Sequence, residues 1–334
     1  MASRDSSHPK KMVSRKEYRK LVDRFGLFIV LGLVGSFAVF VAIALFGGFS
    51  NVISTIGNAN KWYYLLAFAC VFASYIARFF KWDYLTRKLN LKIPKRKNFL
   101  VYLSTNAMSI TPGNIGSVVA AYTIKKLTNN KFAKIIPIVT MNLFTDFVGF
   151  AIFAFLISLY IGKYVIYVII LDLVLVIPFI FILTPWIYNL IKQKKKKGYI
   201  TKKVLKYGGT YYLSQSTLNK PRTYLFSLMY TMPADFLNSF ALYFSLLAVG
   251  LNPRVIVSTF IFSVAQIFGM ISTLPGGVGV ADATLVTLLK SEFMLSSALS
   301  SAVTIMTRIA YLWFGVAIGL IALLWTLRYW KNSK

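Results

Sequence analysis

Charged side chains inside long apolar stretches are the first candidates for chemistry in this sequence. A charge at membrane depth is energetically unfavourable, so such residues usually bind a substrate, carry a proton or pair with one another. Arg308 aligns with Thr145, the neighbour of Asp146, in the internal repeat described below. We expect Asp146 and Arg308 to lie at similar depth, either as an ion pair between two halves of the protein or as contacts to a substrate. The full set comprises Arg78, Asp146, Asp172, Asp235, Asp282 and Arg308.

Two of these residues, Asp282 and Arg78, and the neighbouring Tyr311 carry more specific expectations. Asp282 follows a Pro-Gly-Gly sequence by about one helical turn, where a carboxylate either caps the new helix or takes up a proton. Tyr311 follows Arg308 by about one turn and would share its face, as a ligand of a lipid head group or as an aromatic side chain that only packs. Arg78 lies near the end of an apolar stretch, from which a long side chain can reach the membrane surface.

The apolar pattern is broken twice by Pro-Gly sequences. A helix broken inside lipid leaves backbone groups without partners, so each break must lie within protein or line a wet cavity. The helices that start after the breaks, near Asn114–Ser117 and Gly277–Val280, would point unpaired N–H groups at the centre. Such groups suit an anion such as a phosphate, which makes Asn114 and Ser117 candidate substrate ligands. The alternative is that the tips only cap short packed helices. The tip residues are Pro112, Gly113 and Gly116 in the first break and Pro275, Gly276, Gly277 and Gly279 in the second.

These residues must be positioned by helices that cross or enter a membrane. The chain has 334 residues, of which 57% are hydrophobic, and apolar segments of membrane-spanning length recur along it. Residues 98–126 and 254–290 instead consist of two half-length apolar pieces around each break, and they predict re-entrant helical hairpins. The predicted fold is therefore an all-α polytopic membrane protein. Its full spans are expected at 26–49, 61–80, 134–161, 164–191, 222–249 and 295–326.

Positive charge predicts the orientation. The net charge is +29, and the basic residues lie between apolar segments, which favours a membrane topology signal over nucleic-acid binding. Residues 1–25 contain eight Lys or Arg, 81–97 contain seven and 192–222 contain ten, whereas 50–61, 162–164 and 250–254 contain one each. We expect the basic segments, and both chain termini, on the cytoplasmic side of a cell membrane.

The two breaks belong to an internal repeat. TPGNIGSVVAA (111–121) and LPGGVGVADAT (274–284) align without gaps. An odd number of spans separates them, so the second copy is inverted and the hairpin tips should meet near the midplane, as in many secondary transporters. The chain divides into a basic tail (1–25), a first repeat (26–161) and a second repeat (164–328) that includes a basic cytoplasmic loop (192–221).

Residue counts restrict the chemistry. The single cysteine, Cys70, forms no intrachain disulfide, and the single histidine, His8, lies in the polar tail. The sequence offers no His-based metal site or catalytic triad and no nucleotide-binding motif, so we expect no metal, no cofactor and no enzymatic activity.

The second-half pattern resembles the lysylphosphatidylglycerol synthase transmembrane-region family, which are flippase-like integral membrane proteins. The resemblance rests on PGGVGVADATL and TRIAYLWFGVAIG (307–319), and in the first half on Pro112, Gly113, Gly116 and Asp146; it covers about residues 26–328. Where the family often has charged residues, this chain has Ser117, Ala120, Asn142 and Leu143. We expect that this protein lacks the soluble synthase domain of the large bacterial members.

The resemblance implies translocation of a phospholipid or polyprenyl-linked lipid. Membrane lipids with an anionic head group or a lipid-linked phosphate are the expected partners, bound at the midplane between the hairpins. One alternative is a scaffold or accessory subunit that recruits a lipid- or glycan-modifying enzyme, itself an unidentified membrane protein. Another is a membrane glycosyltransferase, for which Glu292 is a single candidate acid on the outer side.

Overall fold

The protein is all-helical in the residues that the structure describes. This computed structural model describes residues 15–111, 116–184, 189, 192–193 and 199–331, which form helices joined by turns and confirm the predicted helical class. The elements are α1 (Arg15–Phe46), α2 (Phe49–Gly57), α3 (Lys61–Lys88), α4 (Lys95–Thr105), η1 (Asn106–Met108), α5 (Gly116–Thr128), α6 (Phe132–Ile161), α7 (Val165–Leu183), α9 (Tyr199–Leu218), α10 (Pro221–Ala248), α11 (Val255–Ile271), η3 (Pro275–Gly277), α12 (Val280–Phe293), α13 (Ser297–Arg308), η4 (Ile309–Trp313) and α14 (Phe314–Lys331).

Several long helices begin and end at residues that satisfy their terminal backbone groups. Asn60 Oδ1 accepts a hydrogen bond from the backbone N–H of Trp62 at 3.0 Å where α3 begins. Ser296 Oγ accepts from the N–H of Leu299 at 3.2 Å where α13 begins. Gly162 closes α6 in the left-handed conformation, with φ of 71°. These capping residues determine where α3 and α13 begin and where α6 ends, and all three helices carry buried charges.

Three described helical segments are long and apolar enough to cross a membrane, and the bent pair α1–α2 makes a fourth if it counts as one span. The three are α3, α6 and the helix that runs from α13 into α14, and α2 turns 101° away from α1. The predicted span 222–249 corresponds to α10, which carries many buried polar residues on one face. The span 164–191 corresponds to α7, and part of that range lies outside the described residues. A helical membrane protein is supported, and the number of six full spans stays a prediction.

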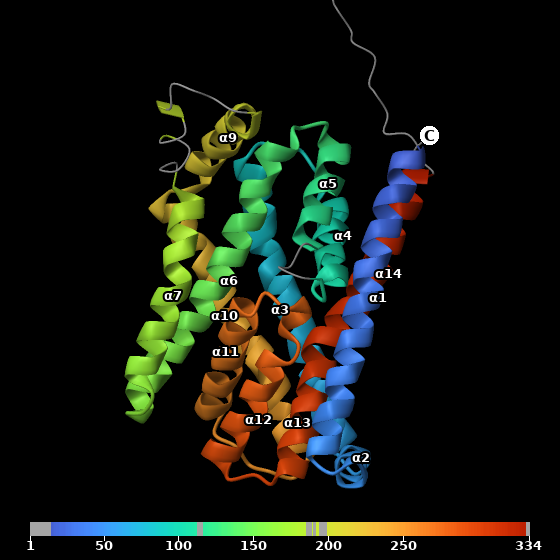
Figure 1. The fold of residues 1–334 in the computed structure, drawn as a ribbon, viewed down its shortest axis with the longest axis vertical. Coiled ribbons are helices and arrows are strands. Elements are labelled where there is room, and N and C mark those ends of the chain that lie inside the picture. Colours follow the sequence, from blue (N-terminus) through green and yellow to red (C-terminus); the bar gives the residue numbers. More distant parts are fainter. Residues whose placement is uncertain (1–14, 112–115, 185–188, 190–191, 194–198, 332–334) are drawn as a thin grey trace, which may run out of the picture.

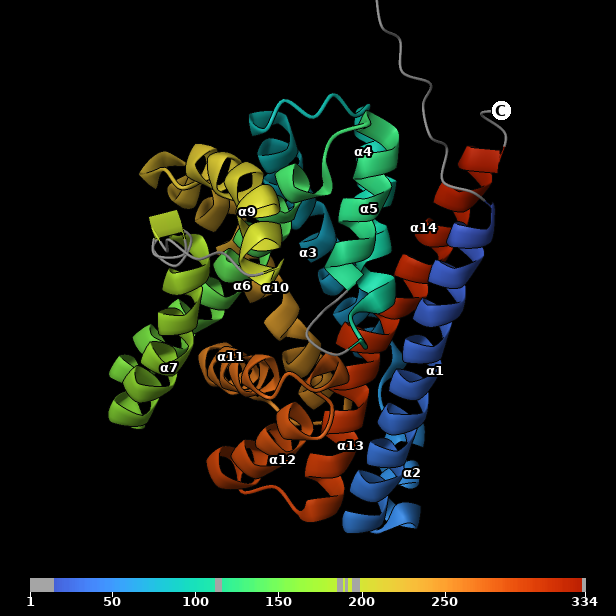
Figure 2. The ribbon, with the colours of Figure 1, turned by 45° about the horizontal axis from the view of Figure 1, so that its top comes forward.

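The basic segments lie at one end of the molecule. The end of α3, the start of α4, the end of α5 and helix α9 lie together at the top of Figure 1, and they include much of segments 81–97 and 192–222. The start of α1 and the end of α14 reach the same end, while α2 and the α6–α7 turn lie at the opposite one (Figures 1 and 2). The segments rich in Lys and Arg therefore lie at one end of the fold, and the segments with few charges lie at the other.

Two helical hairpins extend from these opposite ends and touch at their tips. The first consists of α4 and α5, and the second of α11 and α12 (Figures 1 and 2). Ile110 of the first tip and Val278 of the second are buried in one apolar cluster with Leu312 and Val316. A Cβ built on Gly276 would lie 3.6 Å from Ile110 Cα, so the tips are in direct contact.

Glycines on neighbouring helices make room for the first tip. A Cβ on Gly32 of α1 would lie 2.5 Å from the carbonyl oxygen of Ile110, and one on Gly319 of α14 would lie 2.8 Å from Ala107 Cα. Both contacts are with backbone, so a side-chain rotation cannot relieve them. The close approach of α1 and α14 to the tip therefore depends on the missing side chain at each position.

Candidate functional site

Four buried charges connect α3, α6 and α10, and we call Arg78, Lys81, Asp146 and Asp235 the α3–α6–α10 charge cluster. Lys81 Nζ lies 2.5 Å from Asp146 Oδ1, and Arg78 Nε lies 3.5 Å from the same oxygen. The Arg78 guanidinium also pairs with Asp235 Oδ1. The side chains of Lys81 and Asp235 have no exposed surface, whereas those of Arg78 and Asp146 are 10% and 13% exposed. Two positive and two negative charges thus balance inside the protein.

Neutral polar groups complete the contacts of Lys81 and Asp146. Lys81 Nζ donates a hydrogen bond to Thr145 Oγ1 at 3.1 Å. Asn142 Nδ2 donates to Asp146 Oδ2 at 3.1 Å, so both oxygens of this carboxylate are hydrogen bonded. A buried ion pair needs such additional bonds, because its own attraction barely offsets the loss of hydration.

Arg78 and Asp235 are less evenly satisfied. When the Asn238 amide nitrogen faces Ser74 Oγ, the Asn238 oxygen accepts from Arg78 Nη1 at 2.7 Å, which gives both amide atoms a suitable partner. Asp235 Oδ2, in contrast, is buried and accepts no hydrogen bond. The cluster therefore contains one carboxylate oxygen with unused capacity.

A second buried ion pair lies at the tip of the α11–α12 hairpin. Arg308 Nε lies 2.8 Å from Asp282 Oδ1, with side chains 1% and 0% exposed. Arg308 Nη2 donates to the carbonyl of Gly276 at 2.7 Å. Asp282 Oδ2 accepts from the N–H of Gly279 at 2.7 Å, which confirms the predicted capping role of this carboxylate. One arginine thus ties α13 to both sides of the hairpin tip.

The backbone of this tip needs its glycines. Gly276, Gly277 and Gly279 have φ of 61°, 65° and 89°, a region that favours glycine. A Cβ on Gly277 would also lie 2.7 Å from Gly269 Cα of α11, within the same hairpin. Larger residues here would change both the turn and the packing of its two helices.

Three amide groups of this tip, those of Gly277, Val278 and Gly279, are not free to bind an anion, contrary to the expectation from the sequence. The N–H groups of Gly277 and Val278 donate to the carbonyls of Leu274 and Pro275 at 2.9 and 3.1 Å. The N–H of Gly279 is bonded to Asp282, as described above. These three N–H groups are bonded within the tip, and the charged side chains beside it remain candidate ligands.

Tyr311 lies between the two charged groups. It belongs to the π-helical segment η4, which follows Arg308 directly, and such segments often occur at functional sites. Its ring packs edge-on against Phe262 at 5.1 Å, and its carbonyl accepts from Tyr75 Oη at 3.3 Å. Tyr311 is close enough to interact electrostatically with both Arg78 and Arg308. Tyr311 thus packs as one of the two alternatives predicted, and it lies near both the α3–α6–α10 charge cluster and the Arg308–Asp282 pair.

The expected Asp146–Arg308 ion pair is wrong. Asp146 pairs with residues of α3, and Arg308 pairs with Asp282. Alignment of the repeat predicted that Asp146 and Arg308 lie at similar depth. In the structure, each of the two instead pairs with a nearer charged residue on another helix. Asp172 of α7 belongs to neither group; its Oδ1 is buried without a hydrogen-bond partner.

The first hairpin tip is described only in part. Pro112, Gly113 and Asn114 lie outside the described residues. Gly116 begins α5 and Ser117 follows it, with a side chain that is also outside the described part. The proposed ligand roles of Asn114 and Ser117 stay predictions.

Sequence reasoning missed Lys81 and left Arg78 either a functional charge or a side chain that reaches the membrane surface. The predicted span ended at residue 80, so Lys81 was assigned to a basic loop, whereas α3 continues to Lys88. Both side chains point into the protein, Lys81 fully buried and Arg78 8% exposed. The three-residue spacing places both on one helix face, which was the available signal.

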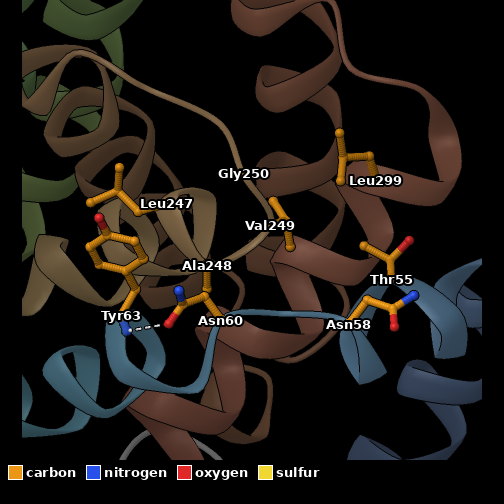
Figure 3. Close-up of a pocket in the computed structure, with 9 residues that line it drawn as sticks. All are labelled: Thr55, Asn58, Asn60, Tyr63, Leu247, Ala248, Val249, Gly250 and Leu299. Carbon is orange, nitrogen blue, oxygen red and sulfur yellow. Dashed lines mark hydrogen bonds between the residues drawn. The ribbon is translucent and has the colours of Figure 1, made fainter.

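A surface pocket lies at the end of the molecule opposite α9, away from these charges. It has a volume of about 510 Å³ and is lined by residues of α2, the start of α3 and the end of α10. Figure 3 shows Asn60 and Tyr63 near Ala248, and Asn58 near Thr55. Its lining includes no charged side chain.

Comparison with known proteins shows a family and a relative that are similar to this chain. The family described as "Lysylphosphatidylglycerol synthase TM region" matches residues 29–319. A protein described as "UPF0104 membrane protein" from Methanothermobacter thermautotrophicus is 24% identical over 294 residues, which cover 79% of this chain and 86% of the relative.

Proposed function

The chain belongs to the lysylphosphatidylglycerol synthase transmembrane-region family of membrane proteins, and we propose that it is a lipid flippase-like transporter. Its substrate would be a phospholipid or a polyprenyl-linked lipid with an anionic head group. The head group would bind near the midplane between the hairpins, and the hydrocarbon tails would remain in the bilayer.

The observation that carries this proposal is the contact between two opposed hairpin tips beside buried charges. Broken helices that meet near a membrane centre are typical of substrate sites in secondary transporters. Here Gly276 touches the first tip at Ile110, while its carbonyl holds Arg308. Movement of the second hairpin would therefore change the surroundings of Arg308 directly.

The order of helices supports an inverted repeat. When first-half residue numbers are shifted by the offset of the Pro-Gly alignment, α3 falls on α10, α4 on α11, α5 on α12, and α6 on α13–α14. The second helix of each hairpin begins at the matched glycine, Gly116 in α5 and Gly279 just before α12. With α1–α2 and α7 as further spans, this gives six spans and two re-entrant hairpins, or eight apolar segments.

An anionic head group would bind by exchange with the protein's own carboxylates. Arg308 is paired with Asp282, and Arg78 and Lys81 are paired with Asp146. A phosphate that replaces Asp282 at Arg308 would pair with the guanidinium and would release the carboxylate that caps α12. Binding would thus loosen the hairpin tip, and one half of the protein could then move against the other to alternate access.

We also propose the orientation. The basic end of the fold would face the cytoplasm and anionic lipid, since each Lys or Arg near such a surface contributes about 1 kcal/mol. The start of α1 and the end of α14 both reach this end, which agrees with two cytoplasmic termini in a cell membrane (Figure 1).

The test is a lipid translocation assay in proteoliposomes, with fluorescent phosphatidylglycerol and a fluorescent polyprenyl phosphate. The informative variant is Asp282→Asn with Arg308→Gln, because removing both charges avoids an unpaired buried charge. Arg254→Gln is the matched control, since Arg254 is an exposed arginine at the start of α11. We expect wild type and the control to move at least one probe and the double variant to move neither.

Equal translocation by the folded double variant would refute a transport role for the Arg308 site. If wild type moves no lipid while a partner enzyme copurifies with it and depends on it, the scaffold alternative replaces the transporter.

A further inference from the structure

The charge balance of the α3–α6–α10 charge cluster determines what it can bind. Arg78 and Lys81 supply two positive charges, and Asp146 and Asp235 supply two negative charges. In a low-dielectric interior, an anion gains little from a neutral cluster but is attracted strongly once one carboxylate is neutralised. Protonation of one aspartate would therefore switch the affinity of the cluster for anions.

Asp235 is the aspartate placed to take this proton. Both oxygens of Asp146 accept hydrogen bonds, from Lys81 and from Asn142. Asp235 Oδ1 accepts from Arg78, but Oδ2 is buried and has no hydrogen-bond partner. A carboxylate oxygen left without a donor in the interior is unfavourable unless it carries a proton.

A row of hydroxyl groups on α10 leads from Asp235 toward the basic end of the fold. Thr223, Ser227 and Thr231 precede Asp235 at four-residue spacing, so all lie along one helix face. Ser227 Oγ and Thr231 Oγ1 are fully buried and have no hydrogen-bond partner, while Thr223 Oγ1 accepts from Lys88 Nζ. Successive positions are about 6 Å apart along the axis, a distance that one bridging water can span.

Helix α6 closes over this row at a glycine. A Cβ on Gly149 would overlap Asp235 Oδ2 and would lie 2.8 Å from Thr231 Cγ2. The unpartnered oxygen and the nearest hydroxyl-bearing side chain therefore share one narrow seam between α6 and α10. Gly149 leaves the space in which Asp235 fits.

We propose that Asp235 is a proton-binding site, and that its protonation makes Arg78 and Lys81 available to an anionic phosphate head group. The inference rests on the proposed function, because the anion is the head group of the transported lipid. A proton from water joins Oδ2 and converts the carboxylate to the neutral acid. Arg78 then keeps Asp146 and the Asn238 oxygen as partners. One proton and one negative charge enter together, so the loaded site is as neutral as the empty one.

Among the titratable groups that surround it, Asp235 is the one to which we assign this change of charge. Those that interact with it are Arg78 and Lys81 of α3, Asp146 of α6, Tyr102 of α4 and Tyr311 of η4. Helices α11 and α13 also pack against α10; α11 has no titratable residue, and Arg308 of α13 is paired with Asp282.

The test measures binding of fluorescent phosphatidylglycerol to the purified full-length protein between about pH 5 and pH 9, with fluorescent phosphatidylcholine as the probe without net charge. Affinity for phosphatidylglycerol should fall about tenfold per pH unit once Asp235 has lost its proton, the slope expected for one linked proton. Asp235→Asn cannot lose a proton, so its affinity should not change with pH. Asp172→Asn, a second carboxylate of a predicted span but outside the cluster, should keep the wild-type slope.

Proton uptake by wild type provides a readout that needs no variant. In weakly buffered solution with a pH-sensitive dye, at a pH where the affinity falls tenfold per pH unit, about one proton should be taken up per phosphatidylglycerol bound, and none per phosphatidylcholine. No uptake, or a wild-type pH slope in Asp235→Asn, would overturn the inference.

Failure of this inference and failure of the proposed function are distinguishable. Proton-linked binding without lipid movement in proteoliposomes supports the proton site and refutes the transporter. Lipid movement that is independent of pH, with no linked proton, overturns the proton site and leaves the transporter.

Discussion

Lys81 of α3 and Asp146 of α6 form an ion pair with an Nζ–Oδ1 distance of 2.5 Å, and the lysine side chain has no exposed surface. The pair joins two helices that are distant in the sequence, at the level where Arg78 links α3 to α10. A lysine in this position depends on its counter-ion, since an unpaired buried charge is strongly unfavourable.

Asp146→Leu should therefore destabilise the protein by about 3–5 kcal/mol, because it leaves Lys81 buried with only the neutral oxygens of Thr145 and Asn142 as partners. Lys81→Met in the same chain should restore most of this loss, since it removes the unpaired charge. Thermal unfolding in detergent of the two single variants and the double variant measures the coupling. Lys163→Met is the control; Lys163 is 62% exposed and 4.0 Å from Glu292, so its loss should change stability by less than about 0.5 kcal/mol. A loss no larger than this in Asp146→Leu would contradict the buried pair.

Arg308→Lys should loosen the second hairpin tip. The guanidinium reaches both Asp282 and the Gly276 carbonyl, whereas a single ammonium cannot reproduce that fork. Loss of one charged hydrogen bond corresponds to roughly 10- to 100-fold faster local opening. Hydrogen exchange at the amides of Gly277 and Val278 measures this change, and the exposed substitution Arg254→Lys should leave it unaltered. Unchanged exchange at the tip would mean that Arg308 does not hold it.

The breaks in the helices could be predicted from the sequence because they depend on local chemistry. Pro275 and three nearby glycines interrupt an apolar pattern, and positive φ at those glycines follows from the absence of a side chain. Asp282 could be recognised as a cap for the same reason, since its spacing from the turn is fixed along the chain. Such features need no knowledge of distant helices.

The ion pairs could not be predicted because they depend on which distant helices meet. Asp146 has Lys81 and Arg78 as partners only because α3, α6 and α10 pack against one another. A basic residue at the end of an apolar stretch usually extends to the membrane surface, so the prediction for Arg78 followed the common case. Burial reverses that outcome; the three-residue spacing of Arg78 and Lys81 indicates a shared helix face but does not show that this face is buried.

Gly319→Ala should separate α14 from the first hairpin tip. The added Cβ would meet the backbone of Ala107, so overpacking should destabilise the protein by about 1–3 kcal/mol. Gly35→Ala is the matched control, because nothing lies within 4 Å of a Cβ at that helical glycine. It should be neutral or stabilising by up to about 1 kcal/mol. Thermal unfolding of both variants decides the point, and equal stability would show that the tip is not held by α14.

The turn between α6 and α7 is tied to the second hairpin by a contact that should depend on pH. Tyr164 Oη donates to Glu292 Oε1 at 2.7 Å, and this hydrogen bond to the carboxylate raises the pKa of Tyr164. A raised folded-state pKa stabilises the protein below the unfolded value, about 10 for tyrosine, and this stabilisation is lost as the pH rises through the folded pKa. Tyr164→Phe should thus lower the unfolding temperature at neutral pH, and its difference from wild type should vanish in alkaline solution. Tyr167→Phe, an exposed tyrosine on α7, controls for the loss of any hydroxyl in this region. A difference between Tyr164→Phe and wild type that persists at alkaline pH would show that the hydroxyl acts through packing and not through its bond to Glu292.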